Sequence, residues 1–172
     1  MLVIDGNKID IAVVDPSMEY GQTDQYIKYS GSKEDLSNII FAARNQKKEI
    51  RYYYKGLSTE EGELISANLI ITEIPPGHIQ PFHTHEKIHE FTLVNKGTIV
   101  AIDSENLQEG ELEEIKKQGK LLKEWDMVIE EPEARHTILN PSDEYAILTT
   151  VQTARIPMED FPTDWKRKKT QP

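Results

Sequence analysis

Short hydrophobic segments separated by turn-forming residues fill the chain between residues 64 and 155. The segments are rich in Ile, Val, Thr, Phe and Tyr, which favour β-strands. The expected strands are Leu64–Ile74, Gln80–His85, Phe91–Val94, Thr98–Ile102, Met127–Glu130, His136–Leu139 and Tyr145–Thr153. Turn formers stand between them at 75–77, 95–97 and 140–143. Many short strands between regular turns predict an all-β sandwich or barrel.

The first 57 residues carry a mixed pattern. Leu2–Ile4 and Ile9–Val14 are expected to be short strands. Ser32 is followed three residues later by Asp35, which is typical of a capped helix start. Hydrophobic residues then recur at helical spacing, so we expect one amphipathic helix over about 33–46. This region is therefore expected to be an N-terminal extension with one short helix.

The remaining segments complete a single-domain chain, 1–172, with an extension at 1–57, a barrel core at 60–155 and a tail at 156–172. Arg51–Lys55, which contains three consecutive tyrosines, is expected to be a strand. The charged stretch 104–124 is expected to be a surface excursion with a helical turn at Glu111–Gln118, and either a lid or a disordered loop. Pro157, Pro162 and Pro172 discourage regular structure in the tail.

Charge and composition narrow the classes of function. The formal net charge is −10, which disfavours binding to nucleic acids and to anionic membranes. No apolar run approaches the roughly 20 residues that cross a bilayer, and Met1–Gly6 does not read as a secretory signal. Cysteine is absent, so disulfides and thiolate metal sites are excluded. A cytoplasmic location is expected.

Four of the five histidines lie between residues 78 and 89, and the fifth is His136. His83 and His85 are two residues apart, so on a strand both side chains point to the same face. Glu90 opens the next expected strand, and His136 begins a later one. Three neutral imidazoles and one carboxylate suit one divalent ion such as iron, nickel, zinc, manganese or cobalt.

The segment Gly77–Gly97 resembles the first motif of the cupin family. That motif is Gly, five residues, His-x-His, four residues, Glu, six residues and Gly, and every fixed position is present here. Gly77 and Gly97 are expected to supply positive φ angles at turns. The resemblance covers roughly residues 60–155 and implies a conical antiparallel β-barrel of the jelly-roll type.

The second cupin motif is partly present at Trp125–Asn140. Its opening glycine is replaced by Trp125 and its inner glycine by Glu133, so the turn before His136 is expected to differ in shape. In the family, the matching positions of the two motifs are the metal ligands. The resemblance therefore implies that His83, His85, Glu90 and His136 are ligands.

Several other residues are weaker candidates for the site. His89 has the opposite strand parity to Glu90 and is expected to face outward. His78 is expected on a surface turn, or at the barrel mouth, and Phe82 in packing against the outer layer. The Tyr52–Tyr54 run is expected to pack as a strand, although one hydroxyl could donate a proton. The basic tail from Trp165 to Lys169 is expected to be solvated.

The resemblance implies a metalloenzyme that acts on a small organic molecule, of dioxygenase, decarboxylase, isomerase or lyase type. Glu90 could act as a catalytic base. The alternative is a non-catalytic cupin that binds or senses a ligand. A homodimer is also expected, since dimers are common in the family and the Tyr-rich strand could extend a neighbour's sheet.

Overall fold

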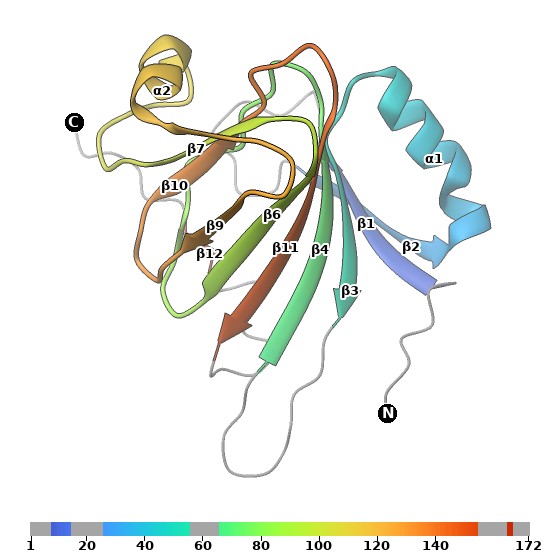
Figure 1. Ribbon diagram of the computed structural model, residues 1–172. Coiled ribbons are helices and arrows are strands. Elements are labelled where there is room, and N and C mark those ends of the chain that lie inside the picture. The colour runs from blue at the N-terminus through green and yellow to red at the C-terminus, as the bar shows by residue number, and fades with distance from the viewer. Residues whose placement is uncertain (1–7, 15–25, 56–65, 155–164, 167–172) are drawn as a thin grey trace, which may run out of the picture.

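The computed structural model describes residues 8–14, 26–55, 66–154 and 165–166. Two main antiparallel sheets form the body of the protein (Figure 1). The larger has the order β2 (Tyr26–Ser32), β1 (Lys8–Val14), β3 (Ile50–Lys55), β4 (Ser66–Ile74), β11 (Ala146–Ala154), β6 (His89–Lys96) and β9 (Met127–Glu130). The smaller has the order β10 (His136–Leu139), β7 (Ile99–Asp103) and β8 (Lys120–Leu122). The expected all-β jelly-roll class is confirmed, and the described sheets do not join into one closed ring.

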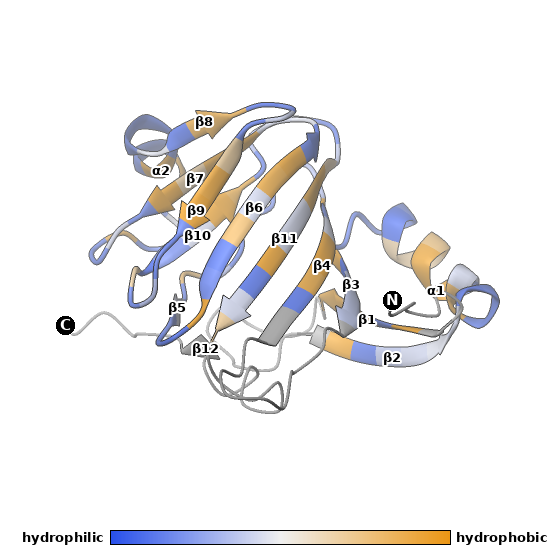
Figure 2. Ribbon diagram, turned by 60° about the horizontal axis from the view of Figure 1, so that its bottom comes forward, coloured by the Kyte–Doolittle hydropathy of each residue, from blue (hydrophilic) through white to orange (hydrophobic). Residues whose placement is uncertain are grey.

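The main core lies between the two sheets. Alternate residues of the central strands point into it: along β11, Ala146, Leu148 and Thr150 are buried and the residues between them are partly exposed. Figure 2 shows hydrophobic positions on β4, β6 and β11, the central strands of the larger sheet. The buried residues of this core are Ile74, Val94, Ile99, Ala101, Leu122, Ile138, Ala146 and Leu148. The strands expected at Met127–Glu130 and His136–Leu139 have those bounds in the structure. The expected strand Leu2–Ile4 lies outside the described residues.

The N-terminal extension is continuous with the larger sheet. Helix α1 (Lys33–Asn45) begins with a capping box, in which the Ser32 Oγ accepts a hydrogen bond from the Asp35 amide and the Asp35 carboxylate accepts one from the Ser32 amide. The buried side chains of the helix cluster with residues of β1 and β3, and Figure 1 shows the helix beside β1 and β2. The expected helix at 33–46 is thus confirmed, whereas strand β2 was not predicted.

The Tyr-rich strand β3 pairs with β1 on one side and with β4 on the other. It is therefore an interior strand with no free edge, and the suggestion that it extends a neighbour's sheet is wrong. Tyr52 and Tyr54 pack against the core under α1. The Tyr52 hydroxyl donates to the Glu73 carboxylate at 2.7 Å. The homodimer stays a prediction.

The stretch 104–124 is a packed part of the fold, so the expectation of a disordered loop is wrong. It contains α2 (Leu112–Gln118), which confirms the expected helical turn. Leu107 and Ile115 are buried against the face of β7 that is turned away from the main core. This second core also contains Phe82, as expected for a residue that packs against the outer layer.

Two shorter elements complete the description. Strand β12 (Trp165–Lys166) pairs with β5 (Thr84–His85), so part of the tail is regular, contrary to expectation. The predicted strand Gln80–His85 is reduced to β5 and one isolated bridge, at His83. No helix in the described ranges is long and apolar enough to cross a membrane.

Candidate metal centre

His83 and His136 face each other across a backbone bridge. The His83 amide donates to the His136 carbonyl at 3.0 Å, and the His136 amide donates to the His83 carbonyl at 2.9 Å. Residues that exchange both hydrogen bonds in an antiparallel pair project their side chains to the same face. The two imidazole centroids are accordingly only 4.3 Å apart, although the residues are far apart in the sequence.

Backbone carbonyls hold both of these rings in one orientation. The His83 Nδ1 lies 2.9 Å from the Pro81 carbonyl oxygen, and the His136 Nδ1 lies 3.0 Å from the Ala134 carbonyl oxygen. Since a carbonyl only accepts, each Nδ1 carries the proton and each Nε2 keeps a lone pair. Metal-bound histidines in proteins are usually fixed in this way through their second nitrogen.

His85 and Glu90 complete the group. The His85 ring centroid lies 5.1 Å from that of His83, as expected for residues two apart on an extended chain. The His85 Nε2 is 3.4 Å from the Glu90 Oε2. Glu90 lies opposite Gln152 in the β6–β11 pair, and its Oε2 accepts a hydrogen bond from the Gln152 Nε2 at 2.7 Å. The predicted residues are thus all brought together.

The donor set fits a divalent cation. One ligand atom from each of His83, His85, Glu90 and His136 lies within 4.8 Å of the others, and all four residues are buried. Ligand atoms about 2.1 Å from a shared ion lie roughly 3 to 4 Å apart. Within the described part of the chain, the His136 Nε2 and both ring nitrogens of His85 make no hydrogen bond. Buried polar atoms without partners are costly, so an ion would satisfy them.

The protonation states also suit a cation. Burial lowers the pKa of His83 well below its usual value, and the neighbouring His136 and His85 rings lower it further. Burial likewise lowers the pKa of His136. For Glu90, burial raises the pKa, but the adjacent imidazoles lower it more, so the carboxyl group stays anionic. Neutral imidazoles and an anionic carboxylate are the forms that bind metals.

His136 also belongs to a second group of possible metal ligands, with Asp103 and Glu130. Ligand atoms of Asp103, Glu130 and His136 also lie within 4.8 Å of one another. Burial raises the pKa of Glu130 to about 8, and the hydrogen bond and negative charge of Asp103 raise it too. Because the His136 Nδ1 is held by Ala134, His136 has only its Nε2 for a metal, and one ion would use it. Sequence reasoning missed Glu130, which faces Glu90 through the β6–β9 pairing.

A small cavity of about 30 Å³ is lined in part by two of the four residues, His83 and Glu90. Further lining residues come from the sheet beside it, including Arg51, Gln80, Thr150 and Gln152. Several of these were not predicted as site residues. The sequence signal for Arg51 was its separation of two residues from Glu49, because two residues so spaced on a strand place both side chains on one face.

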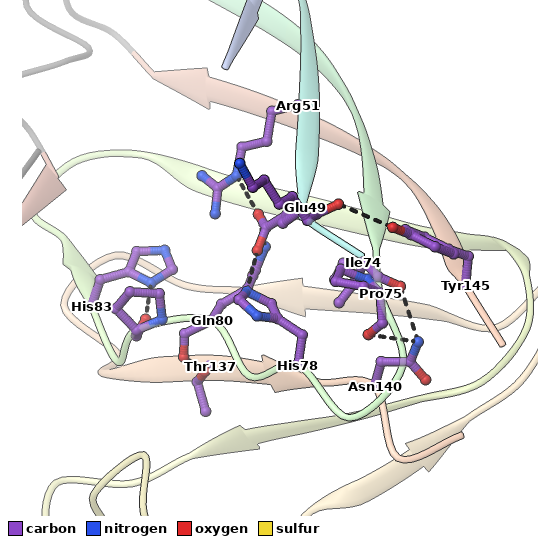
Figure 3. A network of polar contacts seen from close by, with 12 residues as sticks. Glu49, Arg51, Ile74, Pro75, His78, Gln80, His83, Thr137, Asn140 and Tyr145 are labelled. Carbon is purple, nitrogen blue, oxygen red and sulfur yellow. Dashed lines mark hydrogen bonds and ion pairs between the residues drawn. The ribbon is translucent and has the colours of Figure 1, made fainter. Parts of the chain in front are cut away.

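The two histidines outside the group of candidate ligands, His78 and His89, differ in exposure. His89 is exposed, as its strand parity predicted. His78 is half-buried and its Nε2 lies 2.8 Å from the Glu49 Oε2, so the expectation of a plain surface turn residue is wrong. Figure 3 shows His78 and Gln80 on the same side of the Glu49 carboxylate.

The turn before His136 keeps the backbone conformation that glycine would favour. Trp125 has φ 74° and Glu133 has φ 70°, and these are the two positions where the motif's glycines are replaced. The expectation that this turn differs in shape from that of the family stays a prediction. The Glu133 amide donates to the His85 carbonyl, which ties this turn to the strand that carries another candidate ligand. Gly77 and Gly97 have the expected positive φ, 68° and 81°.

We expect Glu133→Gly to be more stable than Glu133→Ala by about 0.5–1 kcal/mol. A left-handed conformation costs a residue with a Cβ about 1–2 kcal/mol, whereas the greater freedom of glycine in the unfolded chain costs about 0.5–1 kcal/mol. Both variants lose the same charge and side chain, so their difference isolates the backbone. Urea unfolding measures it, and an alanine variant as stable as the glycine variant would contradict the conformational argument.

The sequence matches no protein-family model and no curated protein. Solved structures that it resembles include a sugar phosphate isomerase from a cupin superfamily of Silicibacter pomeroyi, at 20% identity and a TM-score of 0.42. That match covers 62% of this chain and 60% of the isomerase, so this chain spans less than two thirds of its length.

Two further neighbours are similar over much of their own length. A Cupin 2 conserved barrel domain protein from Salinispora arenicola is 16% identical, with a TM-score of 0.45, over 66% of this chain and 82% of that one. A conserved protein with a double-stranded β-helix domain from Klebsiella pneumoniae is 16% identical, with a TM-score of 0.42, over 59% of this chain and 77% of that one.

Proposed function

We propose that the protein is a metal-binding cupin that acts as a metalloenzyme on a small organic molecule. The observation that carries this proposal is the convergence of four buried donor atoms within 4.8 Å, beside a cavity that two of the four residues line. The complete first cupin motif supports the same assignment. The proposed ligands are His83, His85, Glu90 and His136.

Each side chain has a defined part in this proposal. A bound divalent ion supplies a Lewis acid next to the cavity. His83 and His136 hold it with nitrogens whose direction the Pro81 and Ala134 carbonyls fix. Glu90 lines the cavity as an anion, held by Gln152, so it is placed to take a proton from a bound substrate. We propose Glu90 as both ligand and catalytic residue.

Metal analysis and turnover together test the proposal. Protein purified after separate exposure to iron, nickel, zinc, manganese and cobalt should retain about one ion of at least one of them per chain after extensive dialysis. The loaded protein is then assayed for product formation from enols, thiols and catechols, with dioxygen uptake for the iron form. Thermal stabilisation by a ligand without any product would favour the non-catalytic binding or sensing function. Retention of no metal would refute the proposed ligands.

We expect metal affinity to fall as the pH drops below about 6. Protons compete with the metal for imidazole lone pairs, and an unperturbed imidazole has a pKa near 6.5. Burial lowers the pKa of His83 and His136, so the loss of metal begins at a pH below the pKa of an unperturbed imidazole. Equilibrium dialysis across pH 4–8 measures the affinity. Full metal content at about pH 4 would contradict ligation by histidine.

A further inference from the structure

Arg51 brings a positive charge to the candidate site from outside the cupin motifs. Strand alternation turns Tyr52 and Tyr54 toward the core under α1, and Arg51 toward the opposite face of the sheet. On that face Arg51 lines the same cavity as His83 and Glu90. Its side chain is 17% exposed, so it lies largely inside the protein. The N-terminal extension thereby contributes directly to the wall of the cavity.

A buried carboxylate holds Arg51 in place. Glu49 is completely buried, and its Oε1 accepts hydrogen bonds from the Arg51 Nε at 2.8 Å and from the Gln80 Nε2 at 2.9 Å. Its Oε2 lies 2.8 Å from the His78 Nε2. Figure 3 shows the guanidinium group on the side of Glu49 where His83 lies. Because Glu49 is bound on both oxygens, the direction of the arginine is fixed before any ligand arrives.

The balance of charge around the cavity favours an anion. Arg51 and Glu90 are the charged residues that line the cavity, so a divalent ion would make the lining positive, whereas the negative charges of Glu49 and Asp103 lie outside the lining, beside Arg51 and His136. Thr150 and Gln152 add polar groups to the wall. A guanidinium group presents planar pairs of N–H donors that match the two oxygens of a carboxylate. The cavity volume of about 30 Å³ restricts the ligand within it to a few heavy atoms.

We propose that Arg51 is a specificity-determining residue that binds a carboxylate oxygen of the substrate, and that the substrate is a small organic acid. This inference rests on the proposed function, because it needs the metal on the opposite side of the ligand. Glu49 acts through Arg51 and is a positioning residue. The competing explanation is that Arg51 only neutralises Glu49, in which case its loss would leave anion binding unchanged.

The test uses the full chain loaded with Co²⁺, as wild type, Arg51→Gln, Arg51→Lys and Arg44→Gln. Arg44 is the matched control, since it also pairs with a glutamate, Glu73, but does not line the cavity. Metal content and the visible Co²⁺ spectrum are recorded first. Each protein is then titrated with acetate, oxalate and malonate, and with acetamide as a neutral probe, and the spectral change gives the affinity.

We expect wild type and Arg44→Gln to bind at least one of the three acids, and Arg51→Gln to bind it at least tenfold more weakly. The affinity for acetamide should stay the same in all four proteins. Arg51→Lys keeps a cation beside Glu49 but loses the planar donor pair, so it should bind the acid severalfold more weakly than wild type. If Arg51→Gln does not fold, Arg51→Lys provides the test.

Three outcomes would overturn the inference. With Co²⁺ fully bound, these outcomes are Arg51 variants that equal wild type for every acid, a wild type that binds no acid, and an affinity for acetamide that falls in parallel with the affinity for the acids. The first two leave the proposed metal site intact and remove only the role of Arg51. Failure of wild type to retain Co²⁺ is a separate result, because it refutes the metal site itself and the inference with it.

Discussion

Replacing His136 by alanine is expected to remove most of the thermal stabilisation that a divalent ion gives. An ion at about one thousand times its Kd stabilises a folded protein by about 4 kcal/mol. For a chain of this size, that corresponds to a rise in Tm of about 8–16 °C. Loss of a group that merely supports a ligand costs about 10–100-fold in affinity, so loss of a ligand should cost more than 100-fold.

At the same concentration of metal, the variant would then be stabilised by less than about 1.4 kcal/mol, a rise of at most about 3–6 °C. Melting curves with and without Zn²⁺ measure both rises, and equilibrium dialysis gives the affinities. His89→Ala is the matched control, since His89 is exposed and lies beside Glu90 in the chain. A full Zn²⁺-induced rise in His136→Ala, or an equal loss in His89→Ala, would contradict the assigned ligands.

Local spacing predicted part of the group of candidate ligands, and the resemblance to the cupin motifs added His136. His83 and His85 share a face because they are two residues apart, and His89 is exposed because its parity is opposite to that of Glu90. The capped helix start at Ser32 was also visible in the sequence, because a capping box is a short-range pattern. These features depend on residues that are close along the chain.

The features that were missed depend on pairing between distant strands. The place of Arg51 in the wall of the cavity is set by the position of β3 between β1 and β4, which no local pattern specifies. Glu130 comes near Glu90 only through the β6–β9 register. The packing of 104–124 was mistaken for a loop because its charged residues outnumber the few apolar ones, such as Leu107 and Ile115, that it buries.

The Glu49 contacts give the N-terminal extension a defined relation to the site. Glu49 is placed just before β3, while His78 and Gln80 belong to the chain that leads to His83. Their hydrogen bonds to one carboxylate therefore join the extension to the segment that carries two candidate ligands. The Tyr145 hydroxyl also donates to the Lys48 carbonyl, so the turn before β3 is held from a second direction (Figure 3).

Replacing Glu49 by glutamine is expected to destabilise the protein by about 3 kcal/mol at pH 7. Removing one partner of a buried ion pair costs about 3–5 kcal/mol, because the remaining charge loses its compensation. The lower end of this range is expected, because the Arg51 side chain is 17% exposed and water can partly solvate its charge. Glutamine has nearly the same shape, so packing changes little. Urea unfolding of the metal-free protein measures the loss, with Glu113→Gln as the control.

Glu113 also forms an ion pair, with Lys116 at 2.8 Å, but its side chain is 88% exposed. Exposed pairs contribute about 0.2–1 kcal/mol, so this control should change stability by less than about 1 kcal/mol. Equal losses in the two variants would contradict the assigned importance of the buried pair.

The pH dependence of the Glu49→Gln effect gives an independent check. Burial raises the pKa of Glu49, but the charge of Arg51 and the contact with His78 lower it more, so it lies well below its usual value. The unfolded chain therefore binds the proton first as the pH falls, and the stability due to the ionised carboxylate is present above about pH 4.5 and lost below it. Glutamine does not titrate. The difference between wild type and Glu49→Gln should consequently narrow between about pH 5 and 3, by at most about 1.4 kcal/mol per pH unit, whereas a constant difference would show that Glu49 is not held as an anion.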